Sequence, residues 1–245
     1  MTDAQHSLPR SVALHLVPGI LTTAAYLFLG PFVMARGFPA LFGLILAVLL
    51  VMIPLELGYL LYQAKKTNGT YSLRGIVLYR EPIPRWQYVI LPLALMVWGF
   101  LASALLHNVE TDMSARFSSW LPKWFFVSSL EEFSVYSRSA LLTTFLVGIV
   151  INAFAGPIVE ELYFRGYLLP RISRFGRWSG PLNVVLFSLY HLWTPWQNLS
   201  RILFMLPVVD VVWRKRNIYV GLLAHGVLNL IVWCLTFGSI LAMGR

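Results

Sequence analysis

Ionisable and amide side chains interrupt the hydrophobic stretches of this 245-residue chain at three places. Residues 160–165 contain two glutamates and an arginine, His191 follows a second apolar stretch, and His225 and Asn229 lie in a third. Ionisable groups are costly inside a bilayer and usually mark a function there. A carboxylate, two imidazoles, an amide and a guanidinium together form a set of side chains suited to hydrolysis.

The two carboxylates of residues 160–165 differ in their expected partners. Glu161 and Arg165 are four residues apart, so one helical turn brings them together as an ion pair. Glu160 is rotated by about 100° from Glu161 and has no cation at that spacing on its own helix. We therefore expect Glu160 to need a proton partner, which His191 could supply.

His225 and Asn229 are also four residues apart and present an imidazole and an amide from one helical face. Glu160 and one imidazole can activate water, while the other imidazole and the amide donate hydrogen bonds to an oxyanion. The same side chains suit a zinc ion, with Glu160, His191 and His225 as ligands and one open position. They could also form a buried polar network that ties three helices together, and spacing alone leaves these three readings open.

Two further acidic residues fall within hydrophobic segments. Asp210 precedes Arg214 by one helical turn, which predicts a salt bridge near the membrane interface. Glu56 has no cation within reach on its own helix, so we expect a structural partner on another helix.

The composition places these residues in a membrane protein. The chain is 58% hydrophobic and 12% charged, with a mean hydropathy of +0.71. This is about half the charge of a soluble domain, which excludes an ordinary soluble enzyme and a disordered chain. The sequence therefore predicts an all-α fold, a polytopic transmembrane bundle of about seven to eight helices with an intramembrane polar site. The single cysteine, Cys234, excludes an intrachain disulfide and a thiolate zinc cluster.

Seven hydrophobic segments are expected to form membrane helices. They cover residues 11–34, 38–63, 86–106, 139–167, 178–193, 199–213 and 218–243. The stretch 108–138 mixes acidic and aromatic residues, and we expect it to be an extracytoplasmic loop that holds an interfacial helix.

Loop charges predict the orientation. The chain has 19 Lys and Arg against 10 Asp and Glu, a net charge of +9. Most of the cations fall in residues 64–85, 171–177 and 214–216 and at Arg10, which places these loops and the N-terminus in the cytoplasm. We attribute the charge to loops that face anionic lipid, and expect membrane lipids rather than nucleic acid as partners. The site is expected near mid-membrane, with access from the cytoplasmic side.

Three motifs in this order resemble a known family. Glu160-Glu161-x-x-x-Arg165, Phe187-x-x-x-His191 and His225-x-x-x-Asn229 lie on successive hydrophobic segments. This order is similar to that of the CAAX protease and bacteriocin-processing family (CPBP, or Abi) of intramembrane endopeptidases. The resemblance covers about residues 139–235, and it suggests catalytic helices over 139–245 that follow N-terminal spans and an interfacial loop over 1–138.

The resemblance implies a role for each motif residue. Glu160 would be the general base that activates water, with His191 assisting it. His225 and Asn229 would stabilise the oxyanion, and the pair Glu161 and Arg165 would orient the site. The family is often labelled a metalloprotease, yet a metal-free glutamate mechanism fits the residues and is favoured here, with zinc as the alternative cofactor.

The implied activity is that of a hydrolase, an intramembrane endopeptidase that cleaves a membrane-associated or lipidated, CAAX-like peptide or protein. Other intramembrane proteases fit less well: the chain has no His-Glu pair for the zinc type, one intramembrane aspartate (Asp210) rather than two, and no glycine context at Ser188. Two competing functions are a non-catalytic immunity or regulatory partner that retains the polar network, and a proton-coupled transporter. The compact loops favour a prokaryotic plasma membrane, and no sequence feature indicates an oligomeric state.

Overall fold

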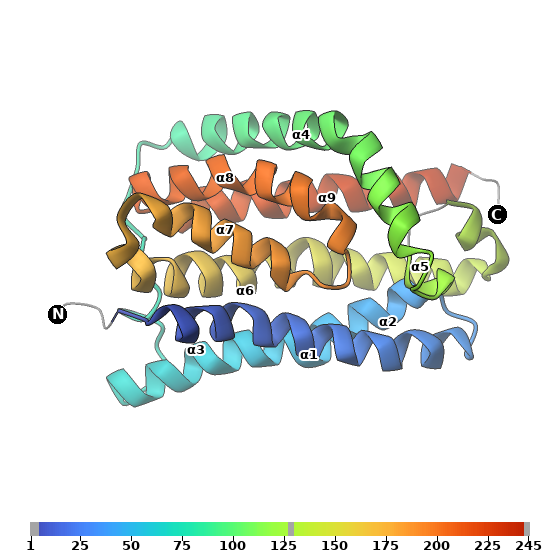
Figure 1. The fold of residues 1–245 in the computed structure, drawn as a ribbon, viewed down its shortest axis with the longest axis horizontal. Coiled ribbons are helices and arrows are strands. Elements are labelled where there is room, and N and C mark those ends of the chain that lie inside the picture. Colours follow the sequence, from blue (N-terminus) through green and yellow to red (C-terminus); the bar gives the residue numbers. More distant parts are fainter. Residues whose placement is uncertain (1–4, 127–129, 243–245) are drawn as a thin grey trace.

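Seven continuous helices make up most of the protein in the computed structural model, which describes residues 5–126 and 130–242 (Figure 1). Five of them are long and apolar enough to cross a membrane, and they cover Leu8–Met34, Ala40–Asn68, Gln87–Phe117, Arg138–Leu168 and Ile218–Ala242. The predicted all-α transmembrane bundle is therefore confirmed, and the chain is an integral membrane protein.

Two of the long helices change their hydrogen-bonding register along their length. The second passes through one π-helical turn, and the fourth passes through two. In chain order the elements are α1 (Leu8–Met34), α2 (Ala40–Ala47), η1 (Val48–Met52), α3 (Ile53–Asn68), α4 (Gln87–Phe117), η2 (Lys123–Phe125), η3 (Leu130–Val135), α5 (Arg138–Gly148), η4 (Ile149–Ala155), α6 (Gly156–Glu160), η5 (Glu161–Leu168), η6 (Pro170–Trp178), α7 (Ser179–Tyr190), η7 (Pro195–Gln197), α8 (Asn198–Lys215) and α9 (Ile218–Ala242).

Seven membrane helices are expected, but α7 and α8 are not among the five described helices that are long and apolar enough to cross a membrane. Their shortness matters for the site. The 12 residues of α7 extend only about 18 Å, against about 30 Å of bilayer hydrocarbon. The connection from α7 to α8 consequently lies part-way along the bundle rather than at its end (Figure 1). Polar side chains of this connection are thereby brought to the depth of the intramembrane residues.

The prediction for residues 108–138 is wrong in two respects. Helix α4 does not end near residue 106 but continues to Phe117, because no proline or glycine interrupts its polar last turns. Among the described residues between α4 and α5, only the short 3₁₀ turns η2 and η3 occur, and no interfacial α-helix is present. Two aromatic residues of this stretch, Phe125 and Phe126, are buried, and Phe126 stacks on Trp196 with ring centroids 4.7 Å apart, whereas Trp120 is exposed.

Backbone hydrogen bonds close one end of the bundle. The N–H of His6 donates to the carbonyl of Arg171 at 2.8 Å, which ties the N-terminal segment to η6. The N–H of Leu78 donates to Gly166, and the N–H of Ile218 donates to Tyr79, each at 2.8 Å. These bonds gather the three cation-rich stretches, residues 64–85, 171–177 and 214–216, at the same end as the N-terminus.

One hydrophobic core extends through both halves of the chain. Tyr26 of α1, Ile45 of α2 and Leu60 of α3 belong to the same buried cluster as Phe164 and Tyr190. The boundary predicted at residue 138 therefore crosses a shared core, and a division into units at that point stays a prediction.

Candidate active site

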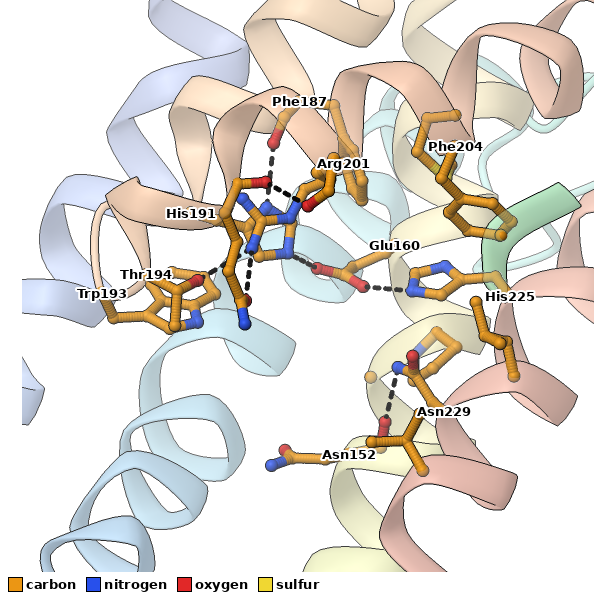
Figure 2. Close-up of a pocket in the computed structure, with 18 of the residues that line it drawn as sticks. Asn152, Glu160, Phe187, His191, Trp193, Thr194, Arg201, Phe204, His225 and Asn229 are labelled. Atoms are coloured by element: carbon orange, nitrogen blue, oxygen red, sulfur yellow. Dashed lines mark hydrogen bonds and ion pairs between the residues drawn. The ribbon is translucent and has the colours of Figure 1, made fainter. Parts of the chain in front are cut away.

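Four of the motif residues come together around a cavity of about 390 Å³ inside the bundle (Figure 2). Glu160 is the last residue of α6, and His191 directly follows α7. His225 and Asn229 lie one turn apart on α9. All four line the cavity, so the structure places them as the motif spacing predicts.

Glu160 lies between the two imidazoles. Its Oε1 is 3.6 Å from Nε2 of His191, and its Oε2 is 3.9 Å from Nε2 of His225 (Figure 2). Both separations are longer than a direct hydrogen bond between nitrogen and oxygen. The carboxylate side chain is only 7% exposed, and the imidazoles of His191 and His225 are 12% and 10% exposed.

The opposite nitrogen of each imidazole is fixed by a partner. Nδ1 of His191 lies 2.9 Å from the carbonyl oxygen of Phe187, which can only accept a hydrogen bond. Nδ1 of His225 lies 3.2 Å from Oε1 of Glu161. With the proton on Nδ1 in both rings, the lone pairs of both Nε2 atoms face Glu160. Such a facing arrangement favours a shared proton, a water or a cation between the carboxylate and the imidazoles.

The predicted ion pair of Glu161 and Arg165 is confirmed, and it is completely buried. Oε2 of Glu161 is 3.6 Å from Nε of Arg165, and neither side chain is exposed. The guanidinium also lies over the ring of Phe187, 3.9 Å from its centroid. Glu161 thus joins Arg165 on one side to His225 on the other, and this connection orients the imidazole.

Asn229 is held by a π-helical turn. Its Nδ2 donates to the carbonyl of Asn152 at 3.1 Å, and Asn152 lies in η4. A π-helical turn shifts the backbone pairing from i→i+4 to i→i+5, and such turns often occur at functional sites. An asparagine amide has two N–H bonds, so Asn229 retains one donor beyond the bond to Asn152.

The sequence analysis does not identify Arg201 as part of the site. Arg201 is the one Lys or Arg among the described cavity-lining residues. It donates to Oγ1 of Thr194 at 2.8 Å and to Oδ1 of Asn198 at 3.1 Å, both in or next to the α7–α8 connection. Arg201 lies near the start of the predicted segment 199–213, and the short length of α7 brings it to the cavity. Glu110 of α4 also lines the cavity, and its Oε1 has no hydrogen-bonding partner among the described groups.

No ion pair of Glu56 with another helix is found among the described residues. Glu56 on α3 is completely buried, and neither of its oxygens has a hydrogen-bonding partner within the described part of the chain. The predicted pair of Asp210 and Arg214 is confirmed at 2.9 Å.

The donor types around Glu160 match those of a zinc site, but their placement does not. In residues 5–126 and 130–242, no three His, Cys, Asp or Glu side chains are arranged so that they could together hold a metal ion.

Comparison with known proteins gives one match. Residues 141–231 match the family model described as "Type II CAAX prenyl endopeptidase Rce1-like". This stretch belongs to the CAAX protease family. The match contains all three motifs, including Glu160, His191, His225 and Asn229, and it agrees with the predicted range of 139–235. No curated protein and no solved structure matches the chain. The matched family is a family of proteases, so the match supports an endopeptidase at the level of the family.

Proposed function

We propose that this protein hydrolyses a peptide bond in a membrane-associated or lipidated, CAAX-like peptide or protein. The observation that carries the proposal is the position of Glu160 between the Nε2 atoms of two imidazoles, at the wall of a cavity within the bundle. A water held between these groups has a base on one side and a free space for substrate on the other.

Glu160 acts as the general base. It removes a proton from a water that also contacts Nε2 of His191, and the water oxygen attacks the carbonyl carbon of the scissile bond. Phe187 keeps His191 in the tautomer that accepts at Nε2. Glu160 later transfers the proton to the leaving amine, so that one water is consumed for each bond cleaved.

The oxyanion is stabilised from α9. The second N–H of Asn229 donates to the developing negative charge, and so does His225 when both of its nitrogens carry protons. Glu161 stabilises that imidazolium through Nδ1, at 3.2 Å, while Arg165 keeps Glu161 in place. Arg201 adds a fixed positive charge to the same cavity.

The cavity wall suits a partly apolar substrate. Away from Glu160 it is formed by side chains such as Leu44, Val48 and Val232 from the second helix and α9. Sites of this kind hold apolar groups and orient them by a few polar contacts. Membrane lipids surround the bundle, and the N-terminus, with the three cation-rich stretches, lies on the cytoplasmic side of a prokaryotic plasma membrane in this proposal.

The decisive experiment is cleavage by purified protein in detergent. A quenched fluorogenic prenylated peptide is assayed beside unmodified peptides, with wild type, Glu160→Gln and the surface variant Glu81→Gln. We expect Glu160→Gln to lower kcat/KM by at least about 10²-fold, since a general base contributes 10²- to 10⁴-fold. Glu81→Gln should leave kcat/KM unchanged, because Glu81 is exposed and 3.9 Å from Arg216 at the cation-rich end.

The same assay, repeated after treatment with a chelator, tests whether the activity depends on a metal ion. Full activity after dialysis against chelator supports water activation by Glu160 and His191 alone, and loss of activity that zinc restores contradicts it. If a folded wild type cleaves none of the peptides, the activity proposal fails and a non-catalytic membrane partner becomes the better explanation.

A further inference from the structure

Besides Glu160 and Glu161, the bundle contains a third buried carboxyl group, which lies on α3. Glu56 of α3 is 0% exposed and does not line the cavity. Both of its oxygens lack a hydrogen-bonding partner among the described residues. Buried polar atoms without partners are rare in folded proteins, so this group needs a physical explanation.

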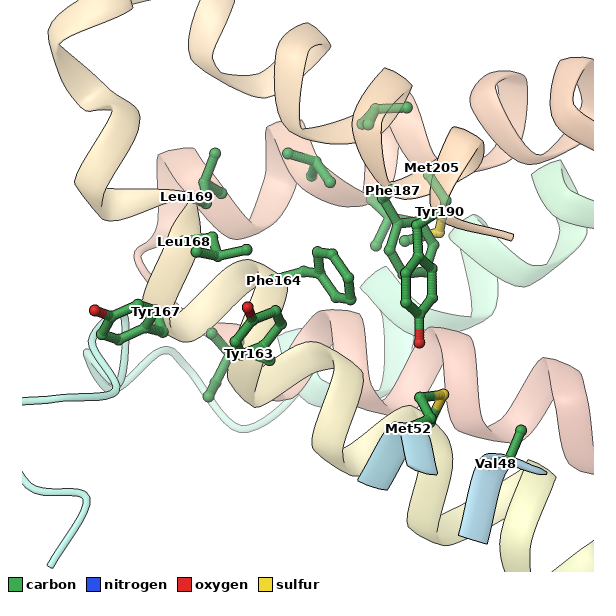
Figure 3. Packing of buried hydrophobic residues seen from close by; sticks show 14 of the residues in the cluster. Val48, Met52, Tyr163, Phe164, Tyr167, Leu168, Leu169, Phe187, Tyr190 and Met205 are labelled. Carbon is green, nitrogen blue, oxygen red and sulfur yellow. The ribbon is translucent and has the colours of Figure 1, made fainter. Parts of the chain in front are cut away.

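The hydroxyl of Tyr190 is near both Glu56 and Glu160. This hydroxyl faces both carboxyl groups and is completely buried. Like the oxygens of Glu56, it makes no hydrogen bond among the described residues. Figure 3 shows this hydroxyl pointing from the end of α7 towards the helix that carries Met52, one turn before Glu56.

Packing leaves the Tyr190 ring little freedom. Its centroid is 4.9 Å from that of Phe164, 4.8 Å from that of His191 and 5.2 Å from that of Trp193. On the other side, a side chain at Gly19 of α1 would collide with the carbonyl of Tyr190. The hydroxyl is therefore held in one direction, as a positioned donor must be.

The charges around the site indicate that Glu56 is neutral. Arg165 is paired with Glu161 at 3.6 Å, and Arg201 faces Glu160. Glu110 faces Arg201 as well, so both cations already have a carboxylate beside them, and an ionised Glu56 would be a further buried negative charge without an ion pair among the described residues. Such a charge costs several kcal/mol in a protein interior. A protonated Glu56 instead has an O–H to donate.

We propose that Glu56 and Tyr190 form a hydrogen-bonded chain that ends on Glu160 and stabilises its ionised form. The acid O–H of Glu56 donates to the Tyr190 oxygen, and the Tyr190 O–H donates to the Glu160 carboxylate. Both are positioning residues, and the inference rests on the proposed function of Glu160. Through Glu56 on α3, the first 138 residues would then help to position the general base. The other ionisable groups that face these three side chains are Tyr163, Glu161, Arg165, His191, Arg201 and His225.

The test is the pH profile of kcat/KM for a set of conservative variants. Tyr190→Phe keeps the ring but removes the donor, so the acid limb should move to higher pH by about one unit. Glu56→Leu should shift it in the same direction, whereas Glu56→Gln should stay near wild type because the amide N–H replaces the acid O–H. Tyr163→Phe is the matched control, since the Tyr163 hydroxyl donates to the backbone carbonyl of Leu14 at 2.8 Å.

A Tyr190→Phe profile that coincides with wild type overturns the proposal, and so does a Glu56→Gln profile shifted as far as that of Glu56→Leu. If Glu56→Leu does not fold, the two tyrosine variants still decide. A second readout does not depend on activity: the infrared difference spectrum between wild type and Glu56→Gln should contain the carbonyl band of a protonated carboxylic acid. If that band is present but no peptide is cleaved, the proposed function fails while the protonated state of Glu56 is supported. If the band is missing, the proposed hydrogen-bonded chain is wrong, whatever the activity.

Discussion

At the scale of single residues, two acid–arginine pairs with identical spacing occupy opposite environments. Glu161 and Arg165 are both 0% exposed, whereas Asp210 and Arg214 are 47% and 70% exposed. The spacing of four residues predicts both pairs, but it contains no information about burial. Burial decides how much free energy of unfolding is lost when one partner is removed, because a buried charge without a partner is far more costly than an exposed one.

This contrast gives a stability prediction. Arg165→Met should lower the free energy of unfolding by about 3–5 kcal/mol, because it leaves Glu161 buried without its cation. Arg214→Met removes the same type of contact at the surface and should cost less than about 1 kcal/mol. Denaturant unfolding of both variants in the same detergent measures the difference, and equal losses would contradict the buried pair as a structural anchor.

At the scale of elements, close helix contacts set the geometry of the site. Gly221 of α9 faces Glu161, and a Cβ at this position would lie 2.7 Å from Oε2 of Glu161 and 3.0 Å from a methyl group of Val212. Glu161 cannot turn aside easily, because it is buried and paired with Arg165. The absence of a side chain at Gly221 is therefore what allows α9 to approach and place His225 one turn later.

The same helix supplies a matched pair of variants. Gly221→Ala should lower kcat/KM by roughly 10- to 100-fold, the usual effect of disturbing groups that orient a catalytic side chain. Gly238→Ala should leave activity at the wild-type level, because no atom lies within 4 Å of a Cβ at that position. Peptide cleavage and thermal unfolding of both variants test this. Unchanged activity in Gly221→Ala would show that the close contact between Gly221 and Glu161 does not set the position of His225.

Elements also show where reasoning from the sequence succeeds and where it stops. Hydropathy identifies the long spans because each needs about 20 apolar residues, and four-residue spacing brings Glu161 to Arg165. Neither rule detects the polar end of α4, which continues to Phe117 as a regular helix. Neither places Arg201 at the cavity, because its depth depends on the shortness of α7 and on how α7 packs. The direction of Tyr190 towards Glu56 is likewise set by tertiary contacts between α1, α3 and α7.

At the scale of the whole molecule, the two ends of the bundle differ. From Glu160 towards the cation-rich end the fourth helix is packed tightly, with Phe164 and Leu168 both 0% exposed. In the opposite direction Asn152, Ser103 and Glu110 line the cavity, and Glu110 lies near the far end of α4. The cavity thus extends from Glu160 away from the cation-rich loops. The expectation of access from the cytoplasmic side disagrees with this position, because it considers depth alone and not which side of Glu160 is filled by side chains.

Substrate access is therefore predicted from the side opposite the cation-rich loops. In a background where Cys234 is replaced by serine, Ser103→Cys lies in the cavity wall and Ser72→Cys lies in the cation-rich stretch 64–85. An impermeant maleimide applied to intact cells should modify Ser103→Cys and leave Ser72→Cys unmodified, while inverted membrane vesicles should show the reverse. Labelling of both positions from the same face would refute this route. Because the Ser72→Cys control reports the orientation of the loops independently, a reversed membrane topology would be recognised as such: both patterns would exchange, while the cavity would still open away from the cations.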